Sequence, residues 1–242
     1  MEKTPTLANI IEHQNAIYGI RNRIRFQSIQ DRIFFLFVAA SDFKKLVRKK
    51  KEKPFLAHGL ARIFSRIICV AEYYGPSIPL AECFTEKWLA ATCRYCGKMP
   101  CECRAAFRPD AVLHPMGPEY TWELREAAGH INALYGANNR KDPIDVLYSR
   151  LVEEISEIIT GVVDMPVSLK SNTDLLRELA LELSDAIAWV LAISNYLEVD
   201  LQDYYLSRYA DGCAKCQSLP CECGAFLWPS VGEWEAATVR LR

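Results

Sequence analysis

Features typical of membrane and secreted proteins are missing from this sequence. Its longest apolar run, residues 33–40, is far too short to cross a bilayer, so we expect no membrane segment. The N-terminus lacks the basic and then apolar pattern of a secretion signal. We therefore expect a cytoplasmic protein whose ten cysteines are reduced or bound to metal. Strand-like alternation of polar and apolar residues is also absent, which predicts an all-α fold.

Net charge is almost absent as well, but the two halves of the chain differ sharply. The formal net charge is −1. Residues 1–110 carry 19 Lys and Arg against 10 Asp and Glu, whereas residues 111–242 carry 10 against 20. The acidic half suits metal binding. The basic half suits an anionic partner, or the acidic half itself.

An internal repeat organises the chain. Two segments recur at matching spacing: CRYCGKMPCEC at 93–103 recurs as CAKCQSLPCEC at 213–223, and HQNAIYG at 13–19 recurs as HINALYG at 130–136. This indicates a tandem duplication of a unit of roughly a hundred residues. The boundaries that we expect are a first unit at 1–104, a linker at 105–118, a second unit at 119–224 and a tail at 225–242.

Helix signals follow the same plan in both units. Thr6 is a candidate N-cap of the first helix, which we expect to end at Tyr18 before a Tyr-Gly turn. Asn172 or Thr173, and later Asp200, are candidate caps in the second unit. The other expected helices span about 26–49, 55–74, 80–91 and 119–134. A further helix begins at 142–143 and ends before a loop at 161–172. The last expected helix ends near 210.

Carboxylates gather on two expected helices of the second unit. One helix carries Glu153, Glu154 and Glu157, and the other carries Glu182 and Asp185. Residues three or four apart share one face of a helix, so each helix presents a row of carboxylates. The second helix is otherwise mostly apolar, and acids on such a helix are costly to bury unless a cation meets them. The pattern predicts a divalent metal site between the helices, with a solvated acidic face as the alternative.

The spacing EExxE, 24 intervening residues and then ExxD resembles the motif of the MazG-like all-α nucleoside triphosphate pyrophosphohydrolases. The segments YGANNR at 135–140 and YLEVDL at 196–201 are also similar to that family. The resemblance extends over residues 129–212, whereas the first half is similar only in shape. It implies hydrolysis of an NTP or dNTP between the α and β phosphates, giving a nucleoside monophosphate and pyrophosphate.

The resemblance also implies roles for individual residues. Glu154, Glu157, Glu182 and Asp185 would bind Mg²⁺ or Mn²⁺, and Glu153 would support the site or orient water. Candidate contacts to the nucleotide are Tyr135, Asn139, Arg140, Arg177, Trp189 and Arg208. For the arginines the alternative is an ordinary surface charge, and for the aromatic residues it is the core.

The first unit lacks the acidic motif. Only Asp31 remains on its corresponding helix, Phe35 falls where Glu157 would be, and residues 54–71 contain no Asp or Glu. We expect a catalytically inactive copy. MazG-like chains normally pair, so this copy would complete the bundle as an intrachain pseudo-dimer, and a further homo-oligomer is compatible with that. Its basic residues could then face nucleotide phosphates or the acidic half.

Each repeated cysteine motif, C-x₂-C-x₄-C-x-C, supplies four thiolates. In a reducing compartment, tetrahedral structural Zn²⁺ is the natural ligand of such a set. The expected ligands are Cys93, Cys96, Cys101 and Cys103 in the first motif and Cys213, Cys216, Cys221 and Cys223 in the second. The close Cys-x-Cys end leaves open whether each motif binds its own ion or the two share one.

Two other functions are open on the sequence alone. One is a non-catalytic nucleotide-sensing or interaction module that uses the zinc knuckles and the basic half. The other is a nucleic-acid-binding zinc protein, which the near-neutral charge disfavours. Retention of all five carboxylates favours the enzyme.

Overall fold

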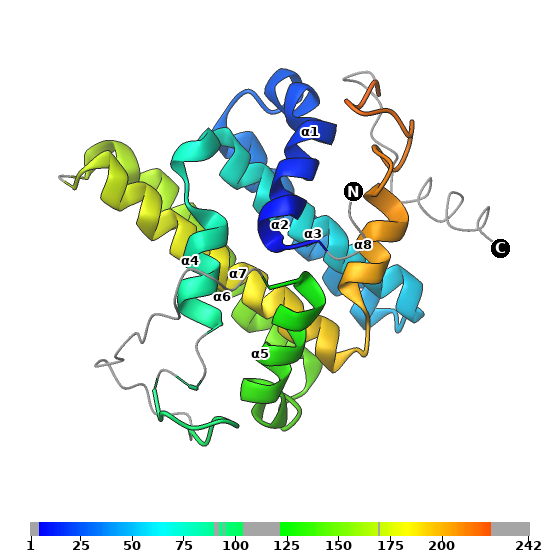
Figure 1. Cartoon of the computed structure of the whole chain (residues 1–242), viewed down its shortest axis with the longest axis vertical. Coiled ribbons are helices and arrows are strands. Elements are labelled where there is room, and N and C mark those ends of the chain that lie inside the picture. Colours follow the sequence, from blue (N-terminus) through cyan, green and yellow to red (C-terminus); the bar gives the residue numbers. More distant parts are fainter. Residues whose placement is uncertain (1–4, 90–91, 94, 104–121, 169, 224–242) are drawn as a thin grey trace.

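The computed structural model describes residues 5–89, 92–93, 95–103, 122–168 and 170–223. Over these residues the predicted all-α class is confirmed, and the only extended pairing is one antiparallel bridge between Thr6 and Glu123. The expected linker and tail lie outside the described residues. The helices, shown in Figure 1, are α1 (Leu7–Arg25), α2 (Ile29–Arg48), α3 (Lys53–Tyr73), η1 (Gly75–Ser77), α4 (Leu80–Trp88), α5 (Leu124–Asn139), α6 (Ile144–Asp164), η2 (Met165–Val167), α7 (Asn172–Tyr196) and α8 (Leu201–Tyr209).

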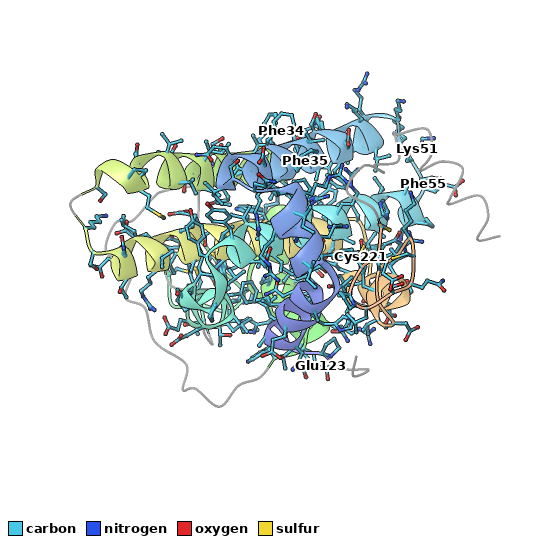
Figure 2. The ribbon with its side chains drawn as sticks, turned by 90° about the horizontal axis from the view of Figure 1, so that it is seen from above. Phe34, Phe35, Lys51, Phe55, Glu123 and Cys221 are labelled. Atoms are coloured by element: carbon cyan, nitrogen blue, oxygen red, sulfur yellow. The ribbon has the colours of Figure 1, made fainter. Side chains whose placement is uncertain are left out.

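Two helix pairs form the centre of the molecule. α2 packs on α3, α6 packs on α7, and α3 and α7 contact each other. In Figure 2, α2 and α6 lie along one side of the molecule, next to α3 and α7. Of the remaining helices, α1 covers α3 and α5 covers α7 within their own halves, whereas α8 covers α3 and α4 covers α7 of the other half. Each half thus packs its last helix against the long central helix of the other half.

Side-chain caps explain several helix starts. The Thr6 hydroxyl accepts a hydrogen bond from the Asn9 amide at 3.2 Å, and the Asp200 carboxylate accepts one from the Asp203 amide at 2.9 Å. Both predicted caps are therefore confirmed. At α7 the cap is Ser171, one residue before the predicted pair. Its hydroxyl accepts from the Asp174 amide at 3.2 Å.

Three helices continue through glycines that we expected to end them. α1 passes Gly19, α5 passes Gly136, and α6 passes Gly161. A glycine inside a helix costs about 1 kcal/mol relative to alanine. Burial of one large aliphatic side chain contributes about 1.5–3 kcal/mol, and Val162 in the extra turn of α6 is 5% exposed. The predicted Tyr-Gly turns and the predicted start of a loop at Gly161 are wrong because packing of the added turns outweighs the propensity of glycine.

We expected no segment that could cross a membrane. Among the described residues, however, the 21-residue helix α3 is long enough and apolar enough to do so by length and composition alone. Its most apolar window is, however, 78% buried inside the bundle. The core contacts of α3 with four neighbouring helices account for this composition.

Candidate active site and cysteine clusters

Three of the five predicted acids come together between α6 and α7. Glu154 and Glu157 extend from α6, and Glu182 extends from α7. Each offers one carboxylate oxygen, and these three oxygens all lie within 4.8 Å of one another. The fully buried Ile155 and Ile158 hold the opposite face of α6 in the core, so the helical period turns the acids toward α7. We call this group the carboxylate cluster.

Crowding of these acids disfavours their ionised forms. Burial raises the pKa of Glu154 to about 7, and the neighbouring charges of Asp185 and Glu157 add to that effect. Burial also raises the pKa of Glu182, together with a hydrogen bond to Glu157 and the charge of Asp185. A bound cation would remove this cost because it favours the ionised carboxylates.

Asp185 lies beside the carboxylate cluster but is held by side chains from α4. Its carboxylate accepts hydrogen bonds from Lys87 Nζ at 2.5 Å and from Trp88 Nε1 at 2.9 Å. The side chains of Asp185 and Lys87 are only 10% and 13% exposed, respectively. Solvent therefore screens this ion pair weakly.

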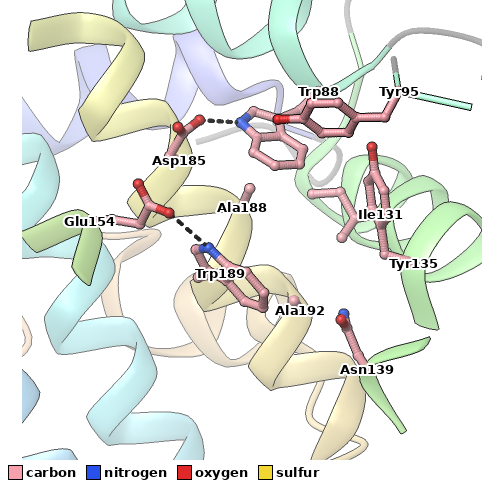
Figure 3. A pocket seen from close by; sticks show the side chains of 10 residues that line it. All are labelled: Trp88, Tyr95, Ile131, Tyr135, Asn139, Glu154, Asp185, Ala188, Trp189 and Ala192. Atoms are coloured by element: carbon pink, nitrogen blue, oxygen red, sulfur yellow. Dashed lines mark hydrogen bonds between the residues drawn. The ribbon is translucent and has the colours of Figure 1, made fainter. Parts of the chain in front are cut away.

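A cavity of about 250 Å³ opens next to Glu154 and Asp185 (Figure 3). Glu154 accepts a hydrogen bond from Trp189 Nε1 at 3.1 Å, which fixes the indole at the cavity wall. The lining is predominantly apolar and aromatic, as in many ligand sites. Its residues are Trp88, Tyr95, Ile131, Tyr135, Asn139, Glu154, Asp185, Ala188, Trp189 and Ala192.

The candidate nucleotide contacts divide into two groups. Tyr135, Asn139 and Trp189 line the cavity, as the sequence analysis expected of a base pocket. The three arginines do not line it. Arg140 donates to Asn132 at 3.0 Å, and Arg177 donates to Glu86 at 2.5 Å.

Arg208 lies on α8, where its charge lowers the pKa of His58 of the first half, after the larger effects of burial and of Arg62. Glu153 also lies apart from the carboxylate cluster. Its side chain is 53% exposed and accepts a hydrogen bond from Arg150 at 2.8 Å. If Glu153 supports the site, it would do so through the electrostatic effect of its negative charge and not by direct contact with the carboxylate cluster.

Sequence reasoning missed three residues of the site, and all three come from the first half. They are Lys87 and Trp88 at the end of α4, and Tyr95 in the first cysteine motif. Nothing in the local pattern relates residue 87 to residue 185, because their proximity arises from the packing of α4 on α7. One feature of the sequence could have indicated Trp88 and Tyr95. Both lie close to Cys93, on either side of it, and the repeat predicted that the two halves contact each other.

The cysteine motifs form two separate clusters. In each motif one sulfur atom from every cysteine lies within 4.8 Å of the others, so each set could hold its own metal ion such as zinc. Burial acts to raise the pKa of Cys216, but backbone hydrogen bonds from Ser218 and Glu222 outweigh it and lower the pKa to about 6. Thiolate character at neutral pH favours metal binding.

Each cysteine cluster docks on the first helix of the other half. The amide of Cys101 donates to the carbonyl of Leu134 at 2.8 Å, and the amide of Cys221 donates to the carbonyl of Ile17 at 2.7 Å. Ile17 and Leu134 occupy the same position in the repeated HxNAxYG segment. The contacts of one half are therefore repeated in the other.

None of the family models, curated proteins or solved structures compared with this chain matches it.

Proposed function

We propose that this chain is a Mg²⁺-dependent nucleoside triphosphate pyrophosphohydrolase that cleaves NTPs or dNTPs between the α and β phosphates. The observation that supports this proposal is the position of the carboxylate cluster at the edge of an aromatic cavity. Hydrolysis of a phosphoanhydride requires neutralised phosphates and a placed water molecule. A nucleoside group in the cavity would direct its phosphates toward the acids.

The donor set fits Mg²⁺ or Mn²⁺. Both are hard cations that prefer oxygen ligands, which Glu154, Glu157 and Glu182 supply together. Burial, and then the charges of Asp185 and Glu157, raise the pKa of Glu154, and a bound cation would offset both effects. When bound, the ion would neutralise phosphate charge and lower the pKa of the attacking water.

The cavity suits the base and sugar of the substrate. Its volume of about 250 Å³ is below the roughly 300 Å³ at which sites for drug-sized ligands begin, so the phosphates would lie outside it. Trp88, Tyr135 and Trp189 offer ring faces for stacking on a base. The Asn139 amide offers a donor and an acceptor for the base edge.

Lys87 brings a cation next to the carboxylate cluster. Its ammonium pairs with Asp185. A triphosphate entering the site would offer the ammonium a stronger anionic partner and leave Asp185 to bind the metal. We assign Lys87 to phosphate binding, and Trp88 to orienting Asp185 through its indole N–H.

We also infer that the two halves are tandem MazG-like units that form an intrachain pseudo-dimer with structural zinc in each cysteine cluster. The exchange of α4 and α8 between the halves supports this inference. The matched hydrogen bonds at Leu134 and Ile17 support it too. In this arrangement the first half is inactive by itself but completes the site of the second.

Pyrophosphate release from a panel of NTPs and dNTPs tests the proposal. We expect turnover with Mg²⁺ or Mn²⁺ and none without a divalent ion. Glu182→Gln should abolish turnover. Glu178→Gln is the matched control, since Glu178 is an exposed acid on the same helix that pairs with Lys170. Unchanged turnover in Glu182→Gln would remove the basis of the assignment.

The ion pair between Lys87 and Asp185 favours one alternative, a non-catalytic nucleotide-binding module. If the ammonium permanently replaces a metal at Asp185, nucleotide would bind without being hydrolysed. Lys87→Ala separates the two functions. Loss of hydrolysis in this variant supports the enzyme, whereas nucleotide binding with no hydrolysis in either protein supports the module.

A further inference from the structure

The first cysteine cluster, at 93–103, lies against the cavity of the second half. Tyr95, which stands between two cysteines of this cluster, is one of the residues that line the cavity. In the view of Figure 3, Tyr95 and Trp88 lie at the top of the cavity, and Trp189 and Asn139 lie at the bottom. The turn that carries the cysteines therefore also supplies part of the cavity wall.

Two hydrogen bonds fasten the same cluster to α5. The amide of Cys101 donates to the carbonyl of Leu134 at 2.8 Å, and the side-chain amide of Asn138 donates to the carbonyl of Cys101 at 2.9 Å. The residues that follow these two positions along α5 are Tyr135 and Asn139, and both line the cavity. Cys101 thus fixes the part of α5 from which these two side chains extend.

An aromatic contact joins α4 to this wall. The rings of Trp88 and Tyr135 pack edge to face, with their centroids 5.9 Å apart. Aromatic pairs in this geometry are stabilised beyond the area that they bury. Trp88 lies five residues before Cys93 and donates its indole N–H to Asp185 at 2.9 Å. The wall supplied by the first half therefore reaches from the cysteine turn to an acid of the candidate site.

The second cysteine cluster, at 213–223, has the same backbone contact but a different side chain next to it. Its Cys221 amide donates to a carbonyl of α1 at 2.7 Å, as the first cluster does to a carbonyl of α5. In the second motif Lys215 takes the position of Tyr95, and this residue is exposed. The second cluster thus directs no aromatic side chain from this position into a cavity wall.

The tyrosine next to the second cluster is closed into the core. Tyr18 corresponds to Tyr135 in the repeated segment, and its hydroxyl accepts a hydrogen bond from the Ala214 amide at 3.4 Å. It is only 5% exposed, and its ring packs edge to face on the ring of Tyr209 with the centroids 6.2 Å apart. Tyr135, in contrast, lines the cavity. The two clusters therefore share a motif but adjoin different surroundings.

A bound metal ion would hold the first turn in this position. Among the described residues, two backbone hydrogen bonds close the turn, from Cys93 to Lys98 at 3.0 Å and from Gly97 to Cys93 at 2.7 Å. The four sulfur atoms of the cluster lie within 4.8 Å of one another, which suits a tetrahedral ion. Metal binding to such a turn contributes directly to the free energy of folding. Loss of the ion should therefore free Tyr95 from its place in the wall.

We propose that the first cysteine cluster, when it holds its metal ion, is a positioning element of the nucleotide pocket, and that Tyr95 is a specificity-determining residue for the base. This inference rests on the proposed binding of a nucleotide in the cavity. The cluster presents the Tyr95 ring to the base and fixes Tyr135 and Asn139 next to it. The second cluster stabilises the fold without acting on the pocket. Metal in one cluster, and not in the other, thus controls nucleotide binding.

Calorimetric titration of the full chain with α,β-methylene analogues of the four NTPs and Mg²⁺ tests the proposal without turnover. Cys96→Ser and Cys216→Ser are a matched pair, because the two cysteines occupy the same position and each variant should lose one zinc ion per chain. We expect Cys96→Ser to weaken binding of the preferred analogue by about tenfold or more, and Cys216→Ser to change it by less than about twofold. The titrations run well below both melting transitions, and circular dichroism checks folding.

Tyr95→Ala tests the side chain with all zinc ligands intact. This variant should keep its zinc and bind the preferred analogue about tenfold or more weakly, because the stacking of the ring on the base is lost. Lys215→Ala is the matched control at the equivalent, exposed position and should bind as the wild type does. This pair decides the question if Cys96→Ser unfolds.

Three results would overturn the proposal. They are equal binding by the wild type and Cys96→Ser, an equal loss of binding in Cys96→Ser and Cys216→Ser, and unchanged binding by Tyr95→Ala. An equal loss in both cysteine variants would show a general loosening of the fold.

A second measurement separates this inference from the proposed function. If no analogue binds to the wild type, the nucleotide proposal fails, and fluorine NMR of protein labelled with 5-fluorotryptophan still tests the cluster. The Trp88 signal, assigned with Trp88→Phe, should shift in Cys96→Ser and stay in place in Cys216→Ser. An unshifted Trp88 signal in Cys96→Ser would overturn the link between the cluster and the cavity.

Discussion

At the scale of single residues, the acids of the carboxylate cluster should destabilise the metal-free protein near neutral pH. A carboxyl group whose pKa is raised on folding is uncharged in both states below its ordinary value of 4.5. Between that pH and about 7, ionisation is easier in the unfolded chain, so the metal-free protein should lose stability as pH rises. A divalent ion should reverse this trend because it binds the ionised forms.

Glu182→Gln should therefore stabilise the metal-free protein at pH 8. This side chain is partly exposed, so solvent screens the gain to about 1 kcal/mol, or roughly 2–4 °C in melting temperature. Well below pH 4.5, the ordinary pKa of a glutamate, this residue is protonated in both the folded and the unfolded chain, and the two proteins should melt together. Thermal melts at both pH values without divalent ions measure the difference. A variant that melts lower than the wild type at pH 8 would show that Glu182 is not strained by its neighbours.

Trp88→Phe tests the contribution of the first half to the site. The substitution keeps a ring at the cavity wall but removes the N–H that donates to Asp185. Loss of one hydrogen bond to a charged group costs about 1.5–3 kcal/mol, so kcat should fall about tenfold or more. Because ring stacking is retained, KM should change less than kcat. Phe84→Leu, a change in the buried face of α4, is the control for packing alone.

At the scale of helices and turns, the sequence predicted much of what the structure contains. Thr6 and Asp200 could be predicted as N-caps because a capping hydrogen bond is local. In each case the side-chain oxygen accepts from the backbone amide three residues later. The ends of helices were harder to predict. Helices α1 and α6 continue past Gly19 and Gly161 because residues beyond these glycines are buried. The acids of α6 and α7 were found from their spacing, whereas Lys87 depends on a contact between helices that no local pattern encodes.

The two cysteine turns offer a matched test of backbone strain. Gly97 and Gln217 occupy the same position in the repeat, with φ values of +66° and +59°. This left-handed region costs a residue with a Cβ atom about 1–2 kcal/mol but costs glycine little. Gln217→Gly should stabilise the second cluster by about 1 kcal/mol, whereas Gln217→Ala should not. Denaturant unfolding of the zinc-loaded protein measures both. An equal gain in the two variants would point to the side chain instead of the backbone.

At the scale of the whole molecule, both halves build the candidate site. Trp88 and Tyr95 of the first half line the cavity, Lys87 pairs with Asp185, and the cysteine clusters dock on opposite first helices. A protein made of residues 119–242 alone should therefore lack activity. Addition of residues 1–118 as a separate chain should restore it in proportion to complex formation, followed by size-exclusion chromatography and pyrophosphate release. Full activity of residues 119–242 alone would contradict the shared site.

Zinc should stabilise the same arrangement. Each cysteine cluster bonds to the backbone of the opposite half, at Leu134 and at Ile17, so loss of the metal should loosen both halves. Cys101→Ser and Cys221→Ser should each lower zinc content by one ion per chain and lower the melting temperature. Elemental analysis of reduced protein gives the stoichiometry. A content of one zinc in the wild type would favour a shared ion over two separate clusters.

The most direct test of the proposed function is phosphorus NMR of the products formed from a nucleoside triphosphate with Mg²⁺. Cleavage between the α and β phosphates predicts equal amounts of nucleoside monophosphate and pyrophosphate from the wild type, and no product from Glu182→Gln. Formation of nucleoside diphosphate and orthophosphate would contradict the reaction. Hydrolysis that persists in Glu182→Gln would contradict the assignment of the carboxylate cluster as its centre.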